Sequence, residues 1–411
     1  MPSQHPSPRP YPRLFARLGQ RLEMPAFEAR SGDDREALQQ AAQLALQVEF
    51  STIPVYLTGL YSIQDPSSEA FQALRAVVME EMFHVNVAAN LVVALGALPR
   101  FTGDAAPKYP GHLPHANPNT TPLLGLYPAS VDVFGKVYAA IENPAPADAP
   151  PQADQYDSIA QLYKALSDAI QAYPGDPFAD PDPNGRQRTD IYLGKFGGDV
   201  QVIRCKKTAQ HAIDQIVRQG EGAVPPYAPL VPVEPFGSYN HYGARTDGTY
   251  GPILGTPLEL SHWARFQRIA LSTDPFPPTA PIISNAHAAT LTNPEARHLA
   301  HLFNHAYNAM LHGFERSFQQ GGDPYFGQVL HLMHKVLPDL SRTLMKTPAY
   351  KGGDADVGPY AAPPWEAALD TNFDAAIAEA LRLARSWTRS GLLPVVEALT
   401  SIHHNHAEAA R

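Results

Sequence analysis

The sequence predicts an all-α protein. Apolar residues recur at steps of three and four along most long segments, and few runs alternate with the period of two that strands require. The chain contains 42 prolines, which are clustered in short stretches. Because proline lacks an amide donor and clashes with the preceding turn, such clusters cannot continue a helix. The pattern therefore indicates helices separated by proline-rich connections.

The proline clusters divide the chain into segments, and the main ones cover 143–154, 173–185, 222–257 and 273–282. Between them, apolar spacing predicts helices over 34–63, 67–97, 129–141, 156–172, 200–220, 257–271, 294–319, 326–346 and 372–400. We expect three regions: an extended N-terminal segment over 1–33, a helical bundle with insertions over 34–275, and a C-terminal helical region over 290–402.

The first predicted helix carries a carboxylate in its apolar face. Glu49 lies within the stretch LALQVEFSTIP, where the apolar spacing requires a buried position. The other residues on this face are Leu38, Ala42, Ala45, Thr52 and Tyr56. A buried carboxylate needs a partner, because an isolated charge is strongly disfavoured in an apolar interior.

The second predicted helix repeats this feature in the stretch MEEMFHV. Glu81 occupies the middle of an otherwise apolar seam, and His84 follows three residues later on the same face. The seam consists of Leu74, Val78, Glu81, Val85, Ala88, Val92 and Leu95. A core ion pair would explain one such Glu-x-x-His motif taken alone.

The segment 257–271 contains the same spacing again, as Glu259 and His262. Capping would explain Glu259, because Thr256 and Pro257 stand where an N-cap residue and a first-turn proline belong. It would not explain His262. The segment 200–220 is followed by Glu221, for which a solvated helix end is as good an interpretation as ligation.

Taken together, these segments offer a recognisable set of metal ligands. One glutamate from each of two helices and a Glu-x-x-His from each of two others is the set by which four-helix bundles hold two iron or manganese ions. Four carboxylates also neutralise two divalent cations when both histidines are neutral. The sequence thus predicts a dinuclear site, with iron preferred over manganese, formed by Glu49, Glu81, His84, Glu221, Glu259 and His262.

The same motifs resemble those of a known protein family. The stretches QVEFSTIPVYLTGLYSI, VVMEEMFHVNVAANLVVALGALPRF, YPGHLP, IVRQGEG and ELSHWARFQRI are similar to the ferritin-like domain of iminophenylpyruvate dimer synthase-type proteins, which act in bisindole pigment biosynthesis. The resemblance covers residues 34–271. It implies a ferritin-like four-helix bundle, with the six residues above as metal ligands.

Composition restricts the class of protein. The formal charge is −9 without any run of lysines or arginines, which argues against nucleic acid or an anionic membrane as a partner. No apolar stretch suggests a signal peptide or a membrane-spanning helix. Cys205 is the single cysteine, so an intrachain disulfide is excluded and a cytoplasmic location is expected.

Three functions fit these features. The favoured one is a di-iron oxidoreductase of secondary metabolism that uses dioxygen to oxidise a small molecule, for which we expect an amino-acid derivative. The second is an imine-coupling enzyme like the dimer synthases, and the third is a non-catalytic iron-binding protein. The long segment 98–199 between the second and third ligand helices argues against a storage-cage subunit.

Other features carry less weight. Tyr56 is a candidate to support the metal ligands, although a plain core tyrosine is the simpler interpretation. The histidines of the segment 294–319 share one helix face, for which a polar surface or a subunit contact is preferred over a second metal site. They are His298, His301, His305 and His312. The sequence leaves a homodimer open as the assembly.

Overall fold

The computed structural model describes residues 31–143, 156–178, 182, 185–189, 200–220, 261–319, 325–368, 371–387 and 390–409. Within these ranges the fold is all-helical, as predicted, and short segments outside the helices pair only through isolated bridges. Two predicted ligands, Glu221 and Glu259, lie outside the described residues, as does the N-terminal segment 1–30.

The bundle is built on two long antiparallel helices, α2 (Ser31–Ser62) and α3 (Glu69–Ala94). Ser68 caps α3, because its hydroxyl accepts a hydrogen bond from the backbone NH of Phe71. Gly96, whose φ is +87°, follows the end of α3 in the left-handed conformation that glycine adopts without strain. Both helices end within a few residues of the predicted positions.

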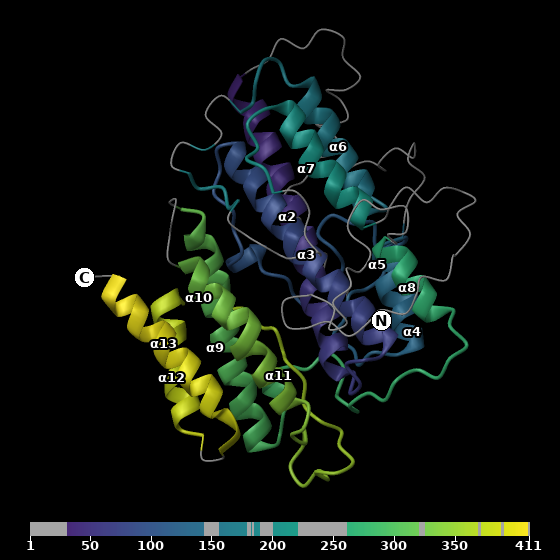
Figure 1. Ribbon diagram of the computed structural model, residues 1–411, viewed down its shortest axis with the longest axis vertical. Coiled ribbons are helices and arrows are strands. Elements are labelled where there is room, and N and C mark those ends of the chain that lie inside the picture. The colour runs from purple at the N-terminus through teal and green to yellow at the C-terminus, as the bar shows by residue number, and fades with distance from the viewer. Residues whose placement is uncertain are drawn as a thin grey trace, which may run out of the picture.

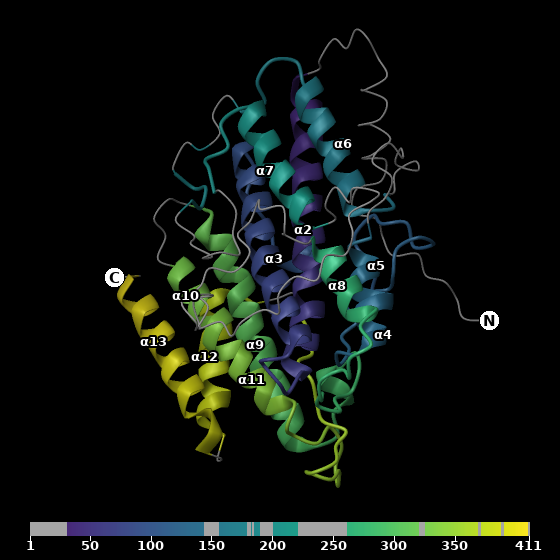
Figure 2. The same ribbon diagram turned by 45° about the vertical axis from the view of Figure 1, so that its right-hand side comes forward.

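Two interrupted helical columns complete the bundle (Figures 1 and 2). The first column contains α4 (Val131–Val133), the π-helical segment η2 (Phe134–Tyr138) and α5 (Ala139–Ile141), with α6 (Ile159–Ala172) further along. The second contains α7 (Lys206–Gln219) and α8 (His262–Ala270). The helical segments η2 and α6 lie in the part of the chain where we expected insertions, and they pack within the bundle: α6 contacts α2 and α7, and η2 contacts α8.

The C-terminal region forms a second group of helices against one side of α2 and α3 (Figure 1). It contains α9 (Pro294–Ser317), then a continuous run of α10 (Tyr325–His331), the π-helical segment η5 (Leu332–Val336) and α11 (Leu337–Leu344). Short 3₁₀ turns also occur at η1 (Gly103–Ala105), η4 (Ala288–Thr290) and η6 (Ser390–Leu392). Most buried apolar side chains of the two regions belong to one continuous cluster, and a second, small cluster contains Ala280, Ile282, Ala286, Met345 and Ala362.

One helix prediction was wrong at this end of the chain. The segment 372–400 forms two helices, α12 (Phe373–Arg385) and α13 (Leu393–Ala409), which pack against each other. Ser386 and Trp387 end α12 with backbone hydrogen bonds to Arg382 and Ala384, so the chain turns back. Both helices lie on the side of α9 that faces away from α2 and α3 (Figure 1).

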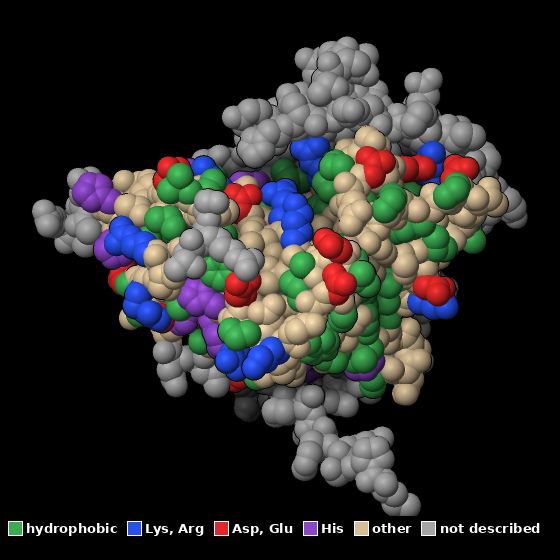
Figure 3. All heavy atoms as spheres, turned by 90° about the horizontal axis from the view of Figure 1, so that it is seen from below, with side chains coloured by type: hydrophobic (Ala, Val, Ile, Leu, Met, Phe, Trp, Pro, Cys, Tyr) green, Lys and Arg blue, Asp and Glu red, His purple; other side chains and the backbone are tan. Residues whose placement is uncertain are grey.

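The burial of α3 and the distribution of surface charge can be compared with the expectations of no membrane-spanning helix and no nucleic-acid partner. α3 is long and apolar enough to cross a membrane, but 89% of its most apolar window is buried inside the protein, which is the pattern of a core helix. Figure 3 shows acidic and basic side chains interspersed on one face, without a separate patch of either sign among the coloured residues.

Candidate metal centre

A cluster of buried carboxylates and imidazoles lies inside the bundle. Glu49 comes from α2, Glu81 and His84 from α3, and His262 from the first turn of α8. Each side chain is at most 2% exposed. Among the described residues, the group of His, Cys, Asp and Glu side chains that could hold a metal ion consists of Glu81, His84 and His262, whose ligand atoms lie within 4.8 Å of one another.

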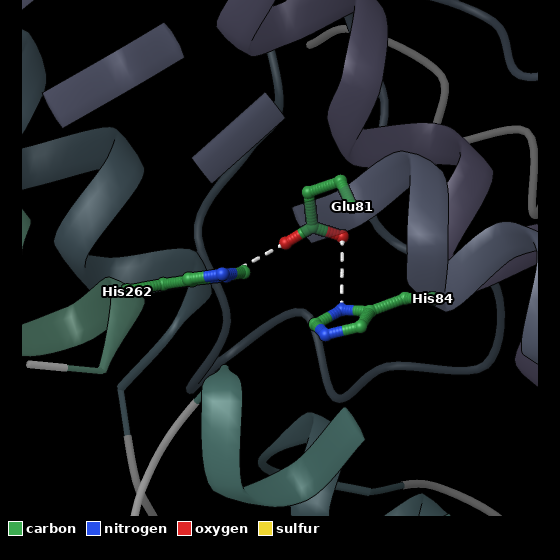
Figure 4. A group of neighbouring side chains, drawn as sticks. All are labelled: Glu81, His84 and His262. Carbon is green, nitrogen blue, oxygen red and sulfur yellow. Dashed lines mark ion pairs between the residues drawn. The ribbon is translucent and has the colours of Figure 1, made fainter. Parts of the chain in front are cut away.

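Glu81 stands between the two histidines (Figure 4). Its Oε1 lies 2.8 Å from Nδ1 of His262, and its Oε2 lies 3.5 Å from Nδ1 of His84. The two imidazole rings are stacked, with their centroids 5.4 Å apart. One carboxylate thus presents a separate oxygen to each histidine, which is the arrangement that a bridging ligand between two ions requires.

Each histidine has a second carboxylate beside it. Glu49 Oε2 lies 3.3 Å from Nδ1 of His84, and Glu142 Oε1 lies 3.8 Å from Nδ1 of His262. Glu142 follows the end of α5, before the first column continues with α6, and its side chain is 1% exposed. The cluster therefore divides into two halves around Glu81: Glu49 with His84, and Glu142 with His262.

The outer nitrogens of both imidazoles are held by other side chains. His84 Nε2 lies 2.8 Å from Gln219 Oε1, and His262 Nε2 lies 2.8 Å from Glu80 Oε2. Because these oxygens only accept hydrogen bonds, both Nε2 atoms must carry a proton. In the neutral tautomer the lone pair is then on Nδ1, which faces Glu81 in both rings.

The partner of His262 is itself paired. Arg265 Nη1 lies 3.0 Å from both oxygens of Glu80. Burial alone would raise the pKa of Glu80, but Arg265 and His262 outweigh burial and lower it. Glu80 is therefore a charged partner of His262, whereas the partner of His84 is the neutral amide of Gln219.

The pKa values of the buried side chains indicate which of them carry protons when no metal ion is bound. Burial raises the pKa of Glu49 to about 7, despite the opposing effect of His84. Burial alone would lower the pKa of His84, but Glu49 and Glu81 raise it to about 10. The pKa of His262 is also raised, since Glu142, Glu80 and Glu81 outweigh burial. In the metal-free protein, protons on the imidazoles balance the buried carboxylates.

These residues fit a bound cation. Three buried atoms of the cluster make no hydrogen bond among the described residues, although two of them have an ion-pair partner nearby: Glu49 Oε1, Glu81 Oε2 and His262 Nδ1. Buried polar atoms are normally satisfied, so three unsatisfied atoms in one cluster indicate a missing partner. Transition-metal ions bond nitrogen and oxygen at about 2.0–2.2 Å, which brings ligand atoms to within about 4.4 Å of each other. The observed spacing of these atoms needs only a small adjustment to reach that value.

An aromatic cluster adjoins the half that contains Glu142. Tyr56 donates a hydrogen bond of 2.5 Å to Glu142 Oε1. The ring of Tyr56 packs against Tyr138, on the π-helical segment η2, and against Phe266 on α8. Tyr56 thus orients the carboxylate of Glu142, and its role as support for metal ligands stays a prediction.

Four described residues of the predicted set meet in the cluster: Glu49, Glu81, His84 and His262. Sequence reasoning missed Glu142, Glu80, Gln219 and Arg265. Glu142 precedes a proline-rich stretch, so the sequence predicts a solvated helix end there. Glu80 lies outside the apolar seam that contains Glu81. Arg265 lies three residues after His262, and its pairing with Glu80 is seen only in the folded structure.

One of the four histidines on the face of α9, His298, has a structural role. His298 Nε2 lies 3.0 Å from the carbonyl oxygen of Leu383, and its ring stacks on Trp387. In the part of the chain that the structure describes, no group of metal-binding side chains forms on this face of α9. His298 therefore joins α9 to α12 within the chain, a packing role that differs from the polar surface or subunit contact expected for this face.

Comparisons with known proteins agree with the helical arrangement. A family model described as ferritin-like matches residues 42–271. This chain belongs to the ferritin-like family. A crystal structure of a ferritin-like protein from Caulobacter vibrioides has the same fold with a TM-score of 0.54 and 23% sequence identity. The match covers 79% of this chain and 96% of that protein. No curated protein matches the sequence.

Proposed function

We propose that this ferritin-like protein is a di-iron oxidoreductase that uses dioxygen to oxidise a small molecule. The observation that carries the proposal is the position of Glu81, which offers one oxygen to the half-site of Glu49 and His84 and the other to the half-site of Glu142 and His262. Manganese is the second choice of metal, because carboxylate and imidazole ligands accept both ions.

The roles of the side chains follow from their contacts. His84 and His262 would bind one ion each through Nδ1, because their Nε2 atoms are engaged by Gln219 and Glu80. Glu81 would bridge the ions, and Glu49 and Glu142 would each complete one half. Two bound iron ions would supply the electron transfer between substrate and dioxygen.

The surroundings favour catalysis over simple storage. In the described residues each half-site holds two side chains plus one oxygen of the shared Glu81. Glu221 and Glu259, which lie outside the described residues, stay predicted ligands, and six protein ligands for two ions would still leave a coordination position for water or substrate, as catalytic metal sites require. The bundle also buries the ligands completely, which excludes bulk water from a reaction centre. A substrate derived from an amino acid, and a place in secondary metabolism, remain part of the proposal on the strength of the sequence resemblance.

The test is to load the full chain anaerobically with ferrous iron and then mix it with dioxygen. We expect about two iron ions per chain and an oxidised di-iron absorption spectrum after mixing. Replacing either histidine by alanine should reduce the bound iron while circular dichroism shows unchanged helicity, because the apolar seam still drives folding. Two bound irons without any oxidation would favour the iron-binding protein, and no bound iron would contradict the metal site itself.

A further inference from the structure

A cavity separate from the metal cluster lies between the bundle and the C-terminal helices. It is an apolar pocket with about 60 Å³ of space that admits a water-sized sphere, and it is open to solvent at its mouth. Side chains from α2, α3, α9, α10, η5 and α11 line it, together with Trp365. Its walls are mainly aromatic and methionine side chains, among them Phe50, Met82, Met310, Phe314, Met333 and Trp365. Nothing in the proposed di-iron chemistry uses this space.

The pocket is separate from the metal cluster, although the same two helices form both. Phe50 directly follows Glu49, and Met82 directly follows Glu81. Consecutive residues of an α-helix point about 100° apart, because each turn contains 3.6 residues. The pocket therefore lies on the neighbouring face of α2 and α3, turned away from the carboxylates.

Two polar atoms among the pocket residues lack partners. Asn86 Oδ1 and the hydroxyl of Tyr307 are buried and have no hydrogen-bond partner among the described residues. The amide of Asn86 is oriented by its Nδ2, which donates to the carbonyl oxygen of Arg188 at 3.0 Å. Each unsatisfied buried group costs about 1–3 kcal/mol, so a ligand that supplies partners would recover this free energy.

The backbone of the pocket wall is also irregular. Met333 and His334 belong to the π-helical segment η5, which interrupts the run from α10 to α11. Single-turn π segments within α-helices occur often at functional sites, because they are retained despite their poorer geometry. Methionine walls adapt to the shape of a ligand, and aromatic walls stack on flat rings.

We propose that this pocket is a binding site for a flat, mainly apolar molecule that carries a hydroxyl or similar polar group. The molecule contacts the aromatic and methionine walls, and the methionine side chains adjust to admit it. The polar group forms a hydrogen bond with Asn86 Oδ1 or with the hydroxyl of Tyr307; both atoms are closed to solvent in this structure, so binding includes a turn of one of these side chains toward the pocket. The molecule enters from an adjoining open cleft, which shares Leu57, Tyr61, Met82, Met333 and His334 with the pocket.

The first experiment measures binding of 2-naphthol to the full-length chain by isothermal titration, with 2-methylnaphthalene as the probe of equal shape that cannot form hydrogen bonds. We expect saturable 1:1 binding of 2-naphthol, about tenfold tighter than that of 2-methylnaphthalene, which corresponds to about 1.4 kcal/mol. The double substitution Asn86→Leu and Tyr307→Phe should abolish the difference between the probes. Absence of saturable 2-naphthol binding, or equal affinity for the two probes in the unaltered protein, would overturn the proposal.

The second experiment locates the ligand without any substitution. In the protein labelled at its methionine methyl groups, 2-naphthol should shift the NMR signal of Met310, which lines the pocket but not the cleft, more than that of Met345, which lines the cleft but not the pocket. Met82 and Met333 line both and should also shift. A shift at Met345 without one at Met310 would place the ligand in the cleft and contradict the assignment. Neither readout depends on bound iron, so the result stands apart from the proposed oxidase activity.

Discussion

Glu80 Oε2 lies 2.8 Å from Nε2 of His262, on the opposite side of the ring from Glu81. The matching position on His84 is filled by the neutral amide of Gln219. A carboxylate stabilises positive charge on the imidazole and makes its other nitrogen a stronger donor to a metal. The two halves of the cluster consequently differ in their electrostatics, although their inner ligands are alike.

Replacing Glu80 by glutamine should weaken one metal position and spare the other. The amide still accepts a hydrogen bond from His262, but it carries no charge and no longer pairs with Arg265. Changes to such outer partners typically weaken metal affinity about 10- to 100-fold. Anaerobic titration with ferrous iron against a competing chelator should show this loss in only one of two binding steps. The exposed Glu36→Gln is the control, and an equal loss in both steps would contradict the division into halves.

The metal-free protein should lose stability as the pH rises from 7 to 10. The pKa of His84 is raised to about 10 in the folded state, above an unfolded value near 6.5. Stability from a raised pKa is fully present below the unfolded value and is lost as the pH passes through the folded value. His262 acts in the same direction. Urea denaturation at pH 7 and pH 10 should differ by more than about 1 kcal/mol, since each pKa unit corresponds to about 1.4 kcal/mol.

A variant at His84 provides the control for this pH effect. His84→Asn keeps a polar side chain but removes one titrating group, so the fall in stability between pH 7 and pH 10 should become smaller. An unchanged dependence in the variant would mean that His84 does not gain its proton from the buried carboxylates.

Two buried tyrosines that pack edge to face should respond differently to loss of the hydroxyl. Tyr56 donates to Glu142, whereas the hydroxyl of Tyr138 has no hydrogen-bond partner among the described residues. Tyr56→Phe leaves a buried carboxylate oxygen without its donor and should lower the free energy of unfolding by about 1–3 kcal/mol. Tyr138→Phe should change it by less than about 0.5 kcal/mol. Chemical denaturation of both variants checks this, and equal losses would refute the assigned contact.

Gly59 should resist substitution even though it lies inside α2. Alanine normally stabilises a helix interior by about 1 kcal/mol relative to glycine. Here a methyl group at residue 59 would collide with the hydroxyl of Tyr138. Overpacking of this kind costs about 1–3 kcal/mol, so Gly59→Ala should lower the thermal midpoint. Adding Tyr138→Phe should restore part of the loss, and a stabilised single variant would contradict the packing.

The sequence predicted most of the fold because apolar spacing and proline clusters report directly on local structure. It also placed Glu81 and His84 correctly in a buried seam, since a charged residue within an apolar period is conspicuous. Glu142 could not be found in this way. Its burial depends on where α5 ends against α2 and α8, and that is set by tertiary packing. The same holds for Gln219, whose role follows from its distance to His84 across the bundle.

The break within the segment 372–400 was missed for a related reason. Its apolar spacing continues through the turn, and glycine and proline come only at Gly391 and Pro394. The turn is stabilised by backbone hydrogen bonds at Ser386 and Trp387 and by the stacking of Trp387 on His298. Such long-range contacts cannot be predicted from the local spacing of apolar residues.

Nearly all of α3 is buried, and it touches the metal cluster on one face and the apolar pocket on the next. A helix of this kind has few sites at which mutation can accumulate without effect. Over evolutionary time, homologues should therefore diverge slowly in α3 and faster on the outer surfaces of α12 and α13. If the proposed oxidoreductase activity holds, changes of substrate preference in such a lineage would have to arise in the surrounding helices, because the shared wall has little freedom to vary.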